Sequence, residues 1–344
     1  MSADAPGRAG GQAPEELRPI LDAAGEQTER MLAETERRLA RIAAPTELPG
    51  GAGELATRAG ATLAAGGKRL RPLLVFLCGA GAADPPPAGE PLVAAACSVE
   101  LIHMAALLHD DVLDRAPLRR GLPTVFATDG RDAAVSTGDH LFARAFGELA
   151  VIGHAGAVQT LSIASSALVR GELMQRADAW SADVVVARYL ERCELKTASL
   201  FETACRLGAL LGAPGPGAAD RLGSFGRQIG LAFQILDDVL DLAGAPGQTG
   251  KRRGTDLLDG TVTLPLIYAR EESAELAALD LRSVTTSEQA ESVCRTVAET
   301  DAFGRATALA LELVADAKRG AASIDLDRIE VLDLVADSVV ARVS

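Results

Sequence analysis

The chain has 344 residues, of which 48% are hydrophobic and 24% charged, and this balance excludes disorder or a coiled coil for most of its length. Basic residues number 34 and acidic residues 47, and the resulting net charge of −13 argues against a nucleic-acid-binding protein. Aromatic residues make up only 3%. Because β-sheets favour aromatic and β-branched side chains, the composition favours helices.

In chain order, the sequence predicts one all-α domain at residues 15–344, preceded by a disordered tail at 1–14. Apolar periodicity predicts long helices at about 15–43, 91–114, 133–152, 155–177, 184–211 and 217–242, with further helices ending near 66, beginning near 71 and, shorter ones, following 260. Loops are expected at 45–53, 81–90 and 243–260. The last is longer than most loops, which indicates a function. No strand of convincing length is expected.

Five widely spaced cysteines in mostly apolar stretches indicate buried, reduced thiols, which favours a cytoplasmic protein without disulfides or a zinc site. The first residues lack the apolar core of a signal peptide. The longest apolar stretch, at about 91–108, is interrupted by Glu100 and His103, so no stable membrane insertion is expected.

The pentapeptide DDVLD occurs twice, each time at the end of an apolar run. Its carboxylates are Asp110, Asp111 and Asp114 in the first copy and Asp237, Asp238 and Asp241 in the second. Helix positions i and i+4 share a face, where like charges repel. A hard divalent cation with oxygen ligands, such as Mg²⁺, removes that repulsion. The alternative, a solvated acidic helix end, explains one copy better than two that both follow buried-type helices.

Three short basic clusters accompany these motifs. They are Lys68, Arg69 and Arg71 in GGKRLRP, Arg119 and Arg120 in RRGLPT, and Lys251, Arg252 and Arg253 in TGKRRGTD. Any one of them could be a solvated loop. Carboxylates, a divalent cation and Arg or Lys together, however, form a site for diphosphate groups. His103 lies two turns before Asp110 on the same helix face, whereas His109 and Lys196 have ordinary structural interpretations on their own.

These motifs resemble those of the trans-isoprenyl diphosphate synthases, the polyprenyl synthetase family. The matching strings are GGKRLRP, ELIHMAALLHDDVLDRAPLRRGLPT, Gly138-Asp139, GEL at 171–173, KTASL, GLAFQILDDVLD and TGKRRGTDLLDGTVTLPL, in the family's order from residue 66 to 266. The resemblance implies an isoprenoid synthase fold, a helical bundle around a deep central cavity, and usually a homodimer. It implies Mg²⁺-dependent, head-to-tail condensation of isopentenyl diphosphate with an allylic diphosphate into a trans-polyprenyl diphosphate.

The resemblance also assigns roles to residues. Asp110, Asp114 and Asp237 match the main ligands of three Mg²⁺ ions, and Asp111, Asp238 and Asp241 support them. Lys68, Arg71, His103 and Arg120 match the isopentenyl diphosphate site. Arg119, Lys196, Thr197, Gln234 and Lys251 match the allylic diphosphate site. One departure is Thr261, where family members often carry a lysine that Arg252 or Arg253 could replace.

Product length is expected to depend on the helix wall one turn before Asp110, because helical side chains lean toward the N-terminus. Ala105 and Ala106 stand there, where short-chain enzymes of the family carry bulky aromatics. We therefore expect products of geranylgeranyl length or longer, with hexaprenyl to octaprenyl favoured, and a shorter product from phenylalanine at either position. Candidate deeper floors are Leu101, Ile102, Phe142 and Phe146.

Two alternatives fit the motifs less well. A class I terpene cyclase also ionises a prenyl diphosphate, but its second metal motif normally contains Asn, Ser or Thr and Glu, and GGKRLRP would be unexplained. A catalytically silent partner subunit would usually lack the aspartates, and this chain keeps all six.

Overall fold

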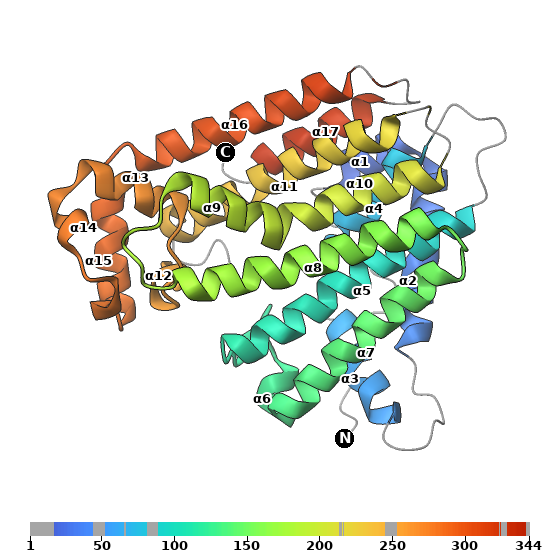
Figure 1. Cartoon of the computed structure of the whole chain (residues 1–344), viewed down its shortest axis with the longest axis horizontal. Coiled ribbons are helices and arrows are strands. Elements are labelled where there is room, and N and C mark those ends of the chain that lie inside the picture. The colour runs from blue at the N-terminus through green and yellow to red at the C-terminus, as the bar shows by residue number, and fades with distance from the viewer. Residues whose placement is uncertain are drawn as a thin grey trace, which may run out of the picture.

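The computed structural model describes residues 17–43, 52–64, 67–80, 89–212, 215, 217–244, 253–322, 324 and 329–341. The expected all-α fold is confirmed (Figure 1). Its elements are α1 Arg18–Ala24, α2 Glu26–Ile42, α3 Ala52–Ala64, α4 Leu70–Gly79, α5 Gly89–Leu113, β1 Leu118–Arg119, β2 Leu122–Pro123, α6 Val125–Asp129, α7 Arg131–Ala150, α8 Ala155–Asp178, α9 Val186–Cys193, the π-helical turn η2 Glu194–Ala198, α10 Ser199–Leu211, α11 Ala218–Ala243, α12 Thr255–Leu258, α13 Leu264–Glu272, α14 Ala274–Ala278, the 3₁₀ turn η3 Leu281–Ser283, α15 Ser287–Ala298, α16 Ala302–Ala321 and α17 Ile329–Val340. The tail predicted at 1–14 lies outside the described residues.

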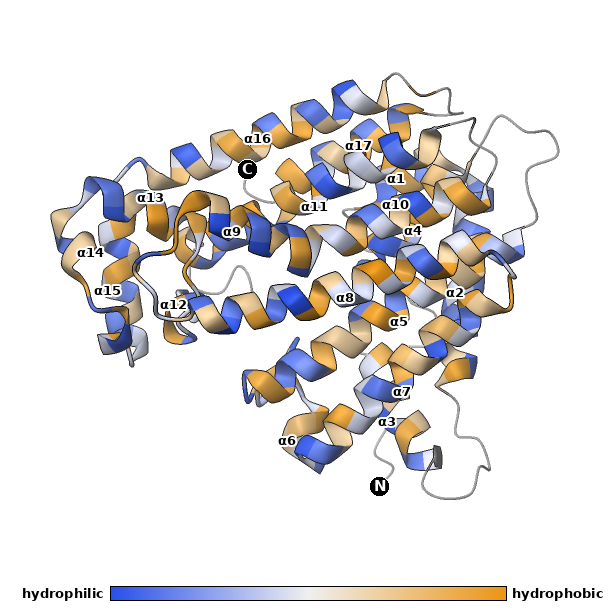
Figure 2. Ribbon diagram, viewed as in Figure 1, coloured by the Kyte–Doolittle hydropathy of each residue, from blue (hydrophilic) through white to orange (hydrophobic). Residues whose placement is uncertain are grey.

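Helices α4 and α5 form the centre of the core. Helix α5 packs against α4, α7 and α10, and α11 packs against α10 and α16. Outer helices such as α16 alternate hydrophilic and hydrophobic residues along their length (Figure 2). Helix α5 is long and apolar enough to cross a membrane, yet 78% of its apolar window is buried inside the protein, as expected of a core helix. All five cysteines are free and buried, as the sequence predicts.

Several predicted helices differ from the observed ones. The helix expected at 15–43 is divided at Gly25, whose φ of +82° is left-handed and ends α1. The helix expected at 184–211 is interrupted by the turn η2. The chain after 260 contains α16, which has 20 residues rather than being short.

The described residues contain no long strand, in agreement with the sequence, but a hairpin with two-residue strands follows the first acidic motif. Arg119 pairs with Leu122 in an antiparallel register. Arg120 and Gly121 form the turn with φ values of +53° and +77°. Two left-handed residues in succession are typical of the tight turns whose twist matches a hairpin. This turn places Arg119 on a strand and Arg120 at the tip.

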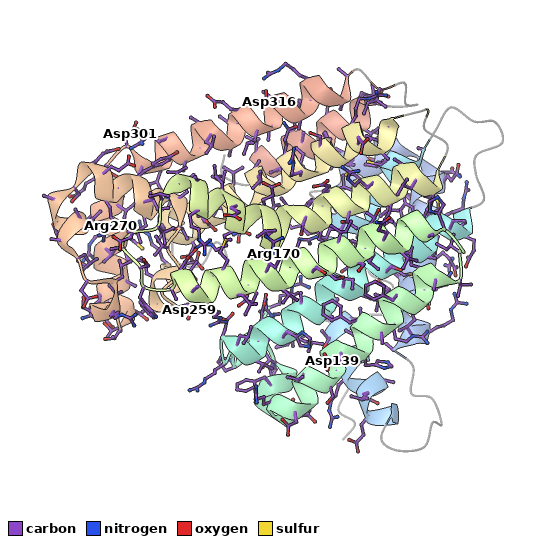
Figure 3. The ribbon with its side chains drawn as sticks, in the orientation of Figure 1. Asp139, Arg170, Asp259, Arg270, Asp301 and Asp316 are labelled. Atoms are coloured by element: carbon purple, nitrogen blue, oxygen red, sulfur yellow. The ribbon has the colours of Figure 1, made fainter. Side chains whose placement is uncertain are left out.

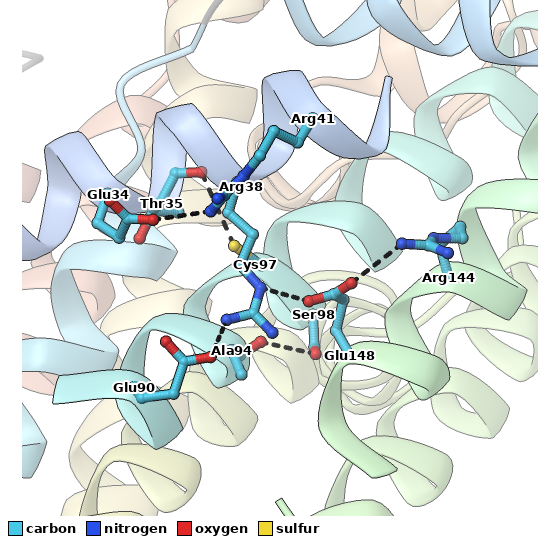
Figure 4. Close-up of polar contacts among 10 residues, drawn as sticks. All are labelled: Glu34, Thr35, Arg38, Arg41, Glu90, Ala94, Cys97, Ser98, Arg144 and Glu148. Atoms are coloured by element: carbon cyan, nitrogen blue, oxygen red, sulfur yellow. Dashed lines mark hydrogen bonds and ion pairs between the residues drawn. The ribbon is translucent and has the colours of Figure 1, made fainter. Parts of the chain in front are cut away.

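An ion-pair cluster ties α2 to α5 and α7 (Figure 4). Arg38 on α2 donates from Nε to Oε2 of Glu148 on α7 at 2.5 Å and also contacts Glu90 on α5. Arg144 donates to the other oxygen of Glu148 at 3.2 Å. The cluster borders a hollow of about 470 Å³. Its charges pair with one another, so we interpret the cluster as structural.

Helix α8 approaches η2 closely because residue 171 is glycine. A Cβ at position 171 would lie 2.6 Å from the backbone nitrogen of Lys196 and 2.9 Å from its Cα. Backbone atoms cannot move aside as a flexible side chain could. Gly171 therefore fixes the distance between α8 and the turn that carries Lys196.

We predict that Gly171→Ala lowers the free energy of unfolding by about 1–3 kcal/mol, the usual cost of overpacking. Gly320→Ala is the matched control, since a Cβ there meets nothing within 4 Å and alanine favours a helix. Urea unfolding of both variants measures the difference. Equal stability of the two variants would show that α8 and η2 can separate at little cost.

Candidate active site

The turn η2 places two adjacent side chains on the two acidic motifs. Lys196 reaches the first motif, with Nζ 3.9 Å from Oδ2 of Asp110. Thr197 reaches the helix of the second motif, donating from Oγ1 to Oε1 of Gln234 at 2.7 Å. Single π turns inside helices often occur at functional sites, because the extra residue redirects side chains. Here the turn packs against α8 and α11, and its Lys196 side chain reaches Asp110 on α5.

Within the first motif, Asp110 and Asp114 face the site and Asp111 faces the core. Asp111 is 4% exposed and accepts a hydrogen bond from Nε of Arg119 at 2.7 Å. Burial raises the pKa of Asp110 to about 6, an effect that Lys196 opposes and that Glu172 and Asp114 strengthen. The positive charges near Asp110 thus do not offset the effect of its burial, whereas Asp111 forms an ion pair with Arg119 of the hairpin.

The structure adds two residues of α8 that the sequence interpretation did not assign. Glu172 forms an ion pair with Lys196, and it accepts a hydrogen bond from Nε of Arg176 at 3.0 Å. Arg176 also donates from Nη2 to Oδ1 of Asp114 at 2.5 Å. Burial disfavours the charge on Lys196, but Asp110 and Glu172 outweigh burial and raise its pKa. Only the string GEL at 171–173 pointed to Glu172.

In the second motif, Asp238 is a buried anchor. Its carboxylate accepts hydrogen bonds from the Tyr189 hydroxyl at 2.6 Å and from Nε2 of Gln234 at 2.7 Å. Burial raises the pKa of Asp238, and these two hydrogen bonds oppose that rise. Because Gln234 donates to Asp238 and accepts from Thr197, the chain of hydrogen bonds fixes the orientation of its amide. Asp237, one residue earlier, is partly exposed.

Asp241 anchors the segment that follows the motif. Its Oδ2 accepts from the backbone nitrogen of Asp256 at 3.2 Å, and its carbonyl accepts from Gly254 at 2.9 Å. Arg253 donates to the carbonyl of Leu242 at 2.5 Å and to Glu291 at 2.9 Å. These contacts occupy Arg253, so it is a poor replacement for the lysine absent at Thr261. Lys251 and Arg252 lie outside the described residues.

Arg71 and Arg120, two of the residues assigned to isopentenyl diphosphate, lie near Glu100 on α5, and so does Arg69, which has no assigned role. Arg69 contacts Glu100 at 2.5 Å. The Arg71 guanidinium lies 4.4 Å over the ring of Phe201, and no described residue accepts from its buried Nε. Burial lowers the pKa of Arg71 to about 10, which still leaves it charged at neutral pH. A buried donor without an acceptor is a site for an anion.

His103 and Arg120 complete this cluster. Burial, together with Arg71 and Arg120, lowers the pKa of His103 well below its usual value, so the imidazole is neutral. A Cβ on Gly67 would lie 3.3 Å from Nη1 of Arg120, so the glycine lets the loop before Lys68 approach the hairpin tip. Lys68 itself is exposed. Two distant strings of the sequence, GGKRLRP and RRGLPT, therefore meet at one place.

The Gly138-Asp139 pair holds His109. A Cβ at position 138 would overlap the imidazole, and Nε2 of His109 lies 3.4 Å from Oδ1 of Asp139. The imidazole also stacks on the ring of Phe142, with ring centroids 5.7 Å apart. His109 thus connects α5 to α7 beside the first motif, which fits a structural role.

The residues assigned to product length fall into two groups. Ala105 and Ile102 are 0% exposed and packed between helices, as is Leu101. Ala106, Phe142 and Phe146 are partly exposed. At 100° per residue, Ala105 points about 140° away from Asp110 and Ala106 only about 40° away. Of the two alanines, Ala106 therefore shares the face of Asp110.

The carboxylates fit a divalent metal such as Mg²⁺. Asp110 and Asp114 present oxygen donors from one face of α5, and the raised pKa of Asp110 shows a need for more positive charge. Across the part of the chain that the structure describes, no three His, Cys, Asp or Glu side chains form a group that could hold a metal ion. Such a donor set suits a metal that takes one or two carboxylates and completes its shell with water and phosphate oxygens.

The comparisons with known proteins agree with this geometry. The profile of the polyprenyl synthetase family matches residues 54–300. The chain belongs to the polyprenyl synthetase family. Heptaprenyl diphosphate synthase component 2 of Geobacillus stearothermophilus is 42% identical over 250 residues, which cover 72% of this chain and 77% of that protein. Geranylgeranyl diphosphate synthase of Methanosarcina mazei is 33% identical over 259 residues, covering 74% of this chain and 79% of the relative.

A solved polyprenyl synthase shares the fold along nearly the whole chain. The crystal structure of polyprenyl synthase from Caulobacter crescentus, complexed with calcium and isoprenyl diphosphate, superposes with a TM-score of 0.83 at 31% identity. The match covers 94% of this chain and 98% of that one. As a member of this family of prenyltransferases, the chain carries both acidic motifs and the basic residues around them.

The hydrogen bond from Tyr189 to Asp238 leads to a prediction. We expect Tyr189→Phe to lower the free energy of unfolding by about 1–3 kcal/mol, because it leaves a buried carboxylate oxygen without a donor. It should also raise KM for the allylic substrate more than for isopentenyl diphosphate, since Asp238 orients Gln234 and Thr197. Urea unfolding and steady-state kinetics with each substrate measure the two effects.

The second tyrosine provides the control. Tyr268 contacts the guanidinium of Arg305 through its ring, at 3.9 Å from the ring centroid, so Tyr268→Phe keeps that contact. It should change neither KM. If Tyr189→Phe lost stability but kept the ratio of the two KM values, Tyr189 would have a purely structural role.

Proposed function

We propose that this prenyltransferase condenses isopentenyl diphosphate with an allylic diphosphate, with the help of Mg²⁺, into a trans-prenyl diphosphate of geranylgeranyl length or longer. The observation that carries the proposal is the placement of Lys196 on Asp110 and of Thr197 on Gln234 from one turn. This places a cation and a hydroxyl between the two acidic motifs, where a leaving diphosphate needs them.

In the proposed mechanism, the chain binds two diphosphates at two places. Arg71, Arg120 and Lys68 bind isopentenyl diphosphate, and the neutral His103 lies among them. Arg119, Lys196, Thr197 and Gln234, with Lys251, bind the allylic diphosphate. Asp110, Asp114 and Asp237 would hold the magnesium ions, supported by Asp111, Asp238 and Asp241. When bound, magnesium neutralises the charge that develops on the leaving diphosphate.

The reaction needs no nucleophile from the protein. The allylic C–O bond breaks, and the double bond of isopentenyl diphosphate forms the new C–C bond. The proton that is then lost passes to the departed diphosphate. The apolar side chains of α5 around the motif exclude water, which would otherwise trap the allylic cation. Keeping the site dry is therefore the task of α5 and the helices packed on it.

The proposal is tested with radiolabelled isopentenyl diphosphate. We expect Asp110→Ala and Asp237→Ala to lower turnover about a hundredfold or more, the effect of losing one electrostatic stabiliser in an enzyme site. Circular dichroism should show that both variants stay helical. Asp316→Ala on α16 is the control, since this exposed carboxylate pairs with Arg319 far along the chain (Figure 3). Near-wild-type turnover in either site variant would contradict the metal assignment.

The same assay separates the alternatives. Hydrocarbon products would indicate a terpene cyclase. No product from the purified chain alone, restored by a second protein, would support a partner subunit, a possibility raised by the word "component" in the name of the Geobacillus relative.

We propose a homodimer in the cytoplasm. Val151, Ile163, Val169 and Leu173, on α8 and the turn before it, are each more than half exposed. An apolar face of this kind is typical of a surface that another protein covers, and a second copy covers it symmetrically. The five buried free cysteines agree with a reducing compartment.

For product length, we propose that the prenyl tail passes Ala106 and stops at a deeper floor, at hexaprenyl to octaprenyl length. Relatives include heptaprenyl, octaprenyl and geranylgeranyl synthases, so the family permits this range. A prenyl tail that runs from Asp110 toward the N-terminus of α5, along the helix face of Asp110, meets Ala106 after one turn.

We predict that Ala106→Phe shortens the main product toward farnesyl, because a phenyl ring fills the space that the tail must cross. Ala105→Phe should instead destabilise the fold by about 1–3 kcal/mol, since Ala105 is fully buried away from that face. Chromatography of the dephosphorylated products measures the product length of each variant, and urea unfolding measures its stability. Unchanged products from Ala106→Phe, or a farnesyl product from the wild type, would place the length determinant elsewhere.

A further inference from the structure

Both site-facing carboxylates of the first motif already contact a cation of the protein. Arg176, in the last turn of α8, donates to Asp114 at 2.5 Å and to Glu172 at 3.0 Å. Lys196 lies 3.9 Å from Asp110 and also pairs with Glu172. Glu172 is therefore shared by the two cations, and three carboxylates face two positive charges. Nothing in the family motifs assigns Arg176.

The two cations differ in how firmly they are held. The Lys196 side chain is 24% exposed, belongs to the rigid turn η2 and has two carboxylates beside it. The Arg176 side chain is 40% exposed and lies at the end of a helix. If it leaves Asp114, Arg176 keeps its partner Glu172, one turn back on α8. Releasing Asp114 therefore leaves no buried charge unpaired.

A divalent metal at Asp110 and Asp114 would have to share the Asp114 carboxylate with Arg176, which already donates to Oδ1. We propose that Arg176 competes with the divalent metal for Asp114, so that the metal binds weakly until a diphosphate brings its own negative charge. This inference rests on the proposed function, because it concerns the metal that the proposed reaction uses. Arg176 acts through Asp114 and is a positioning residue, not a catalytic one. It sets the order in which metal and substrate enter.

The experiment measures Mn²⁺ binding to the full chain without substrate, by the electron paramagnetic resonance signal of free Mn²⁺. We expect Arg176→Gln to bind the first Mn²⁺ about fivefold more tightly than the wild type, the worth of one partly exposed ion pair. Arg176→Lys, which keeps the charge but loses the two-pronged contact, should fall in between. Arg170→Gln is the matched control, because Arg170 is an exposed arginine of the same helix (Figure 3).

A second measurement adds inorganic diphosphate. The wild type should gain more Mn²⁺ affinity from diphosphate than Arg176→Gln does, since the variant has no cation to displace. Circular dichroism of each variant checks the fold. Unchanged Mn²⁺ affinity in Arg176→Gln would overturn the inference. An equal gain in Arg170→Gln would overturn it too, by showing a general field effect, as would the failure of every variant to bind Mn²⁺.

Prenyl transfer is assayed separately, so that the two proposals can fail independently. A wild type that binds Mn²⁺ more weakly than Arg176→Gln but makes no prenyl diphosphate would support the competition at Asp114 and contradict the proposed function. An active wild type with the Mn²⁺ affinity of Arg176→Gln would do the reverse.

Discussion

Six carboxylates lie near the ends of two largely apolar helices, and the cations and hydrogen-bond donors of the chain must balance their charge. Burial raises the pKa values of Asp110 and Asp238, which shows how strongly the interior disfavours this charge. The turn η2 contacts the helices of both motifs. Lys196 lies near Asp110, and the hydroxyl of Thr197 donates to Gln234 on the helix of the second motif. A regular helix would place these adjacent side chains 100° apart on one cylinder. The additional residue of a π turn changes that spacing, and Gly171 and Gly230 let α8 and α11 come close enough for the contacts to form.

The sequence predicts the helices well where an apolar face continues without interruption, and less well where one residue changes the backbone. Helix α5 was expected at 91–114 and is observed at Gly89–Leu113 because its apolar run is nearly continuous. The break at Gly25 was not expected, since a glycine can also continue a helix and only the fold decides its φ. The turn η2 leaves no mark in the hydrophobic pattern, because its residues keep helical dihedral angles. The hairpin at Arg120 and Gly121 is too short to show strand periodicity, and its only local sign is the glycine that follows two arginines between Leu118 and Leu122.

For the site, the sequence could give the residue types that carry charge but not the partner of each. Two adjacent aspartates on a helix point 100° apart, so both cannot face the site. One aspartate of each pair is therefore expected to point toward the core. Asp111 and Asp238 are those residues, and their partners Arg119 and Tyr189 come from elements 8 and 49 residues away. Arg176 has no motif around it, and its contact with Asp114 spans 62 residues. Arg253 illustrates the opposite case, since a cation in a promising string turns out to hold backbone carbonyls and Glu291. Tertiary pairing of this kind follows from the packing of whole helices, which one sequence does not reveal.

Under the proposed roles, helix α5 also explains how one chain could hold two diphosphates without bringing them into contact. His103 and Asp110 share a face and are seven residues apart, which is about 10 Å along the axis at 1.5 Å per residue. The arginines gather at the His103 end, and the carboxylates that suit a metal lie at the Asp110 end. Each substrate then places its diphosphate at its own end, and the five-carbon unit of isopentenyl diphosphate meets the allylic carbon between them. Of the partly exposed residues of that interval, His109 contacts Asp139 and Phe142 on α7, and Ala106 and Leu107 are apolar. These two apolar side chains can exclude water from the reacting carbons, whereas a polar residue in their place would bring water to the cation. Under those roles, the spacing of the two charge clusters on one helix sets the distance between the reactants.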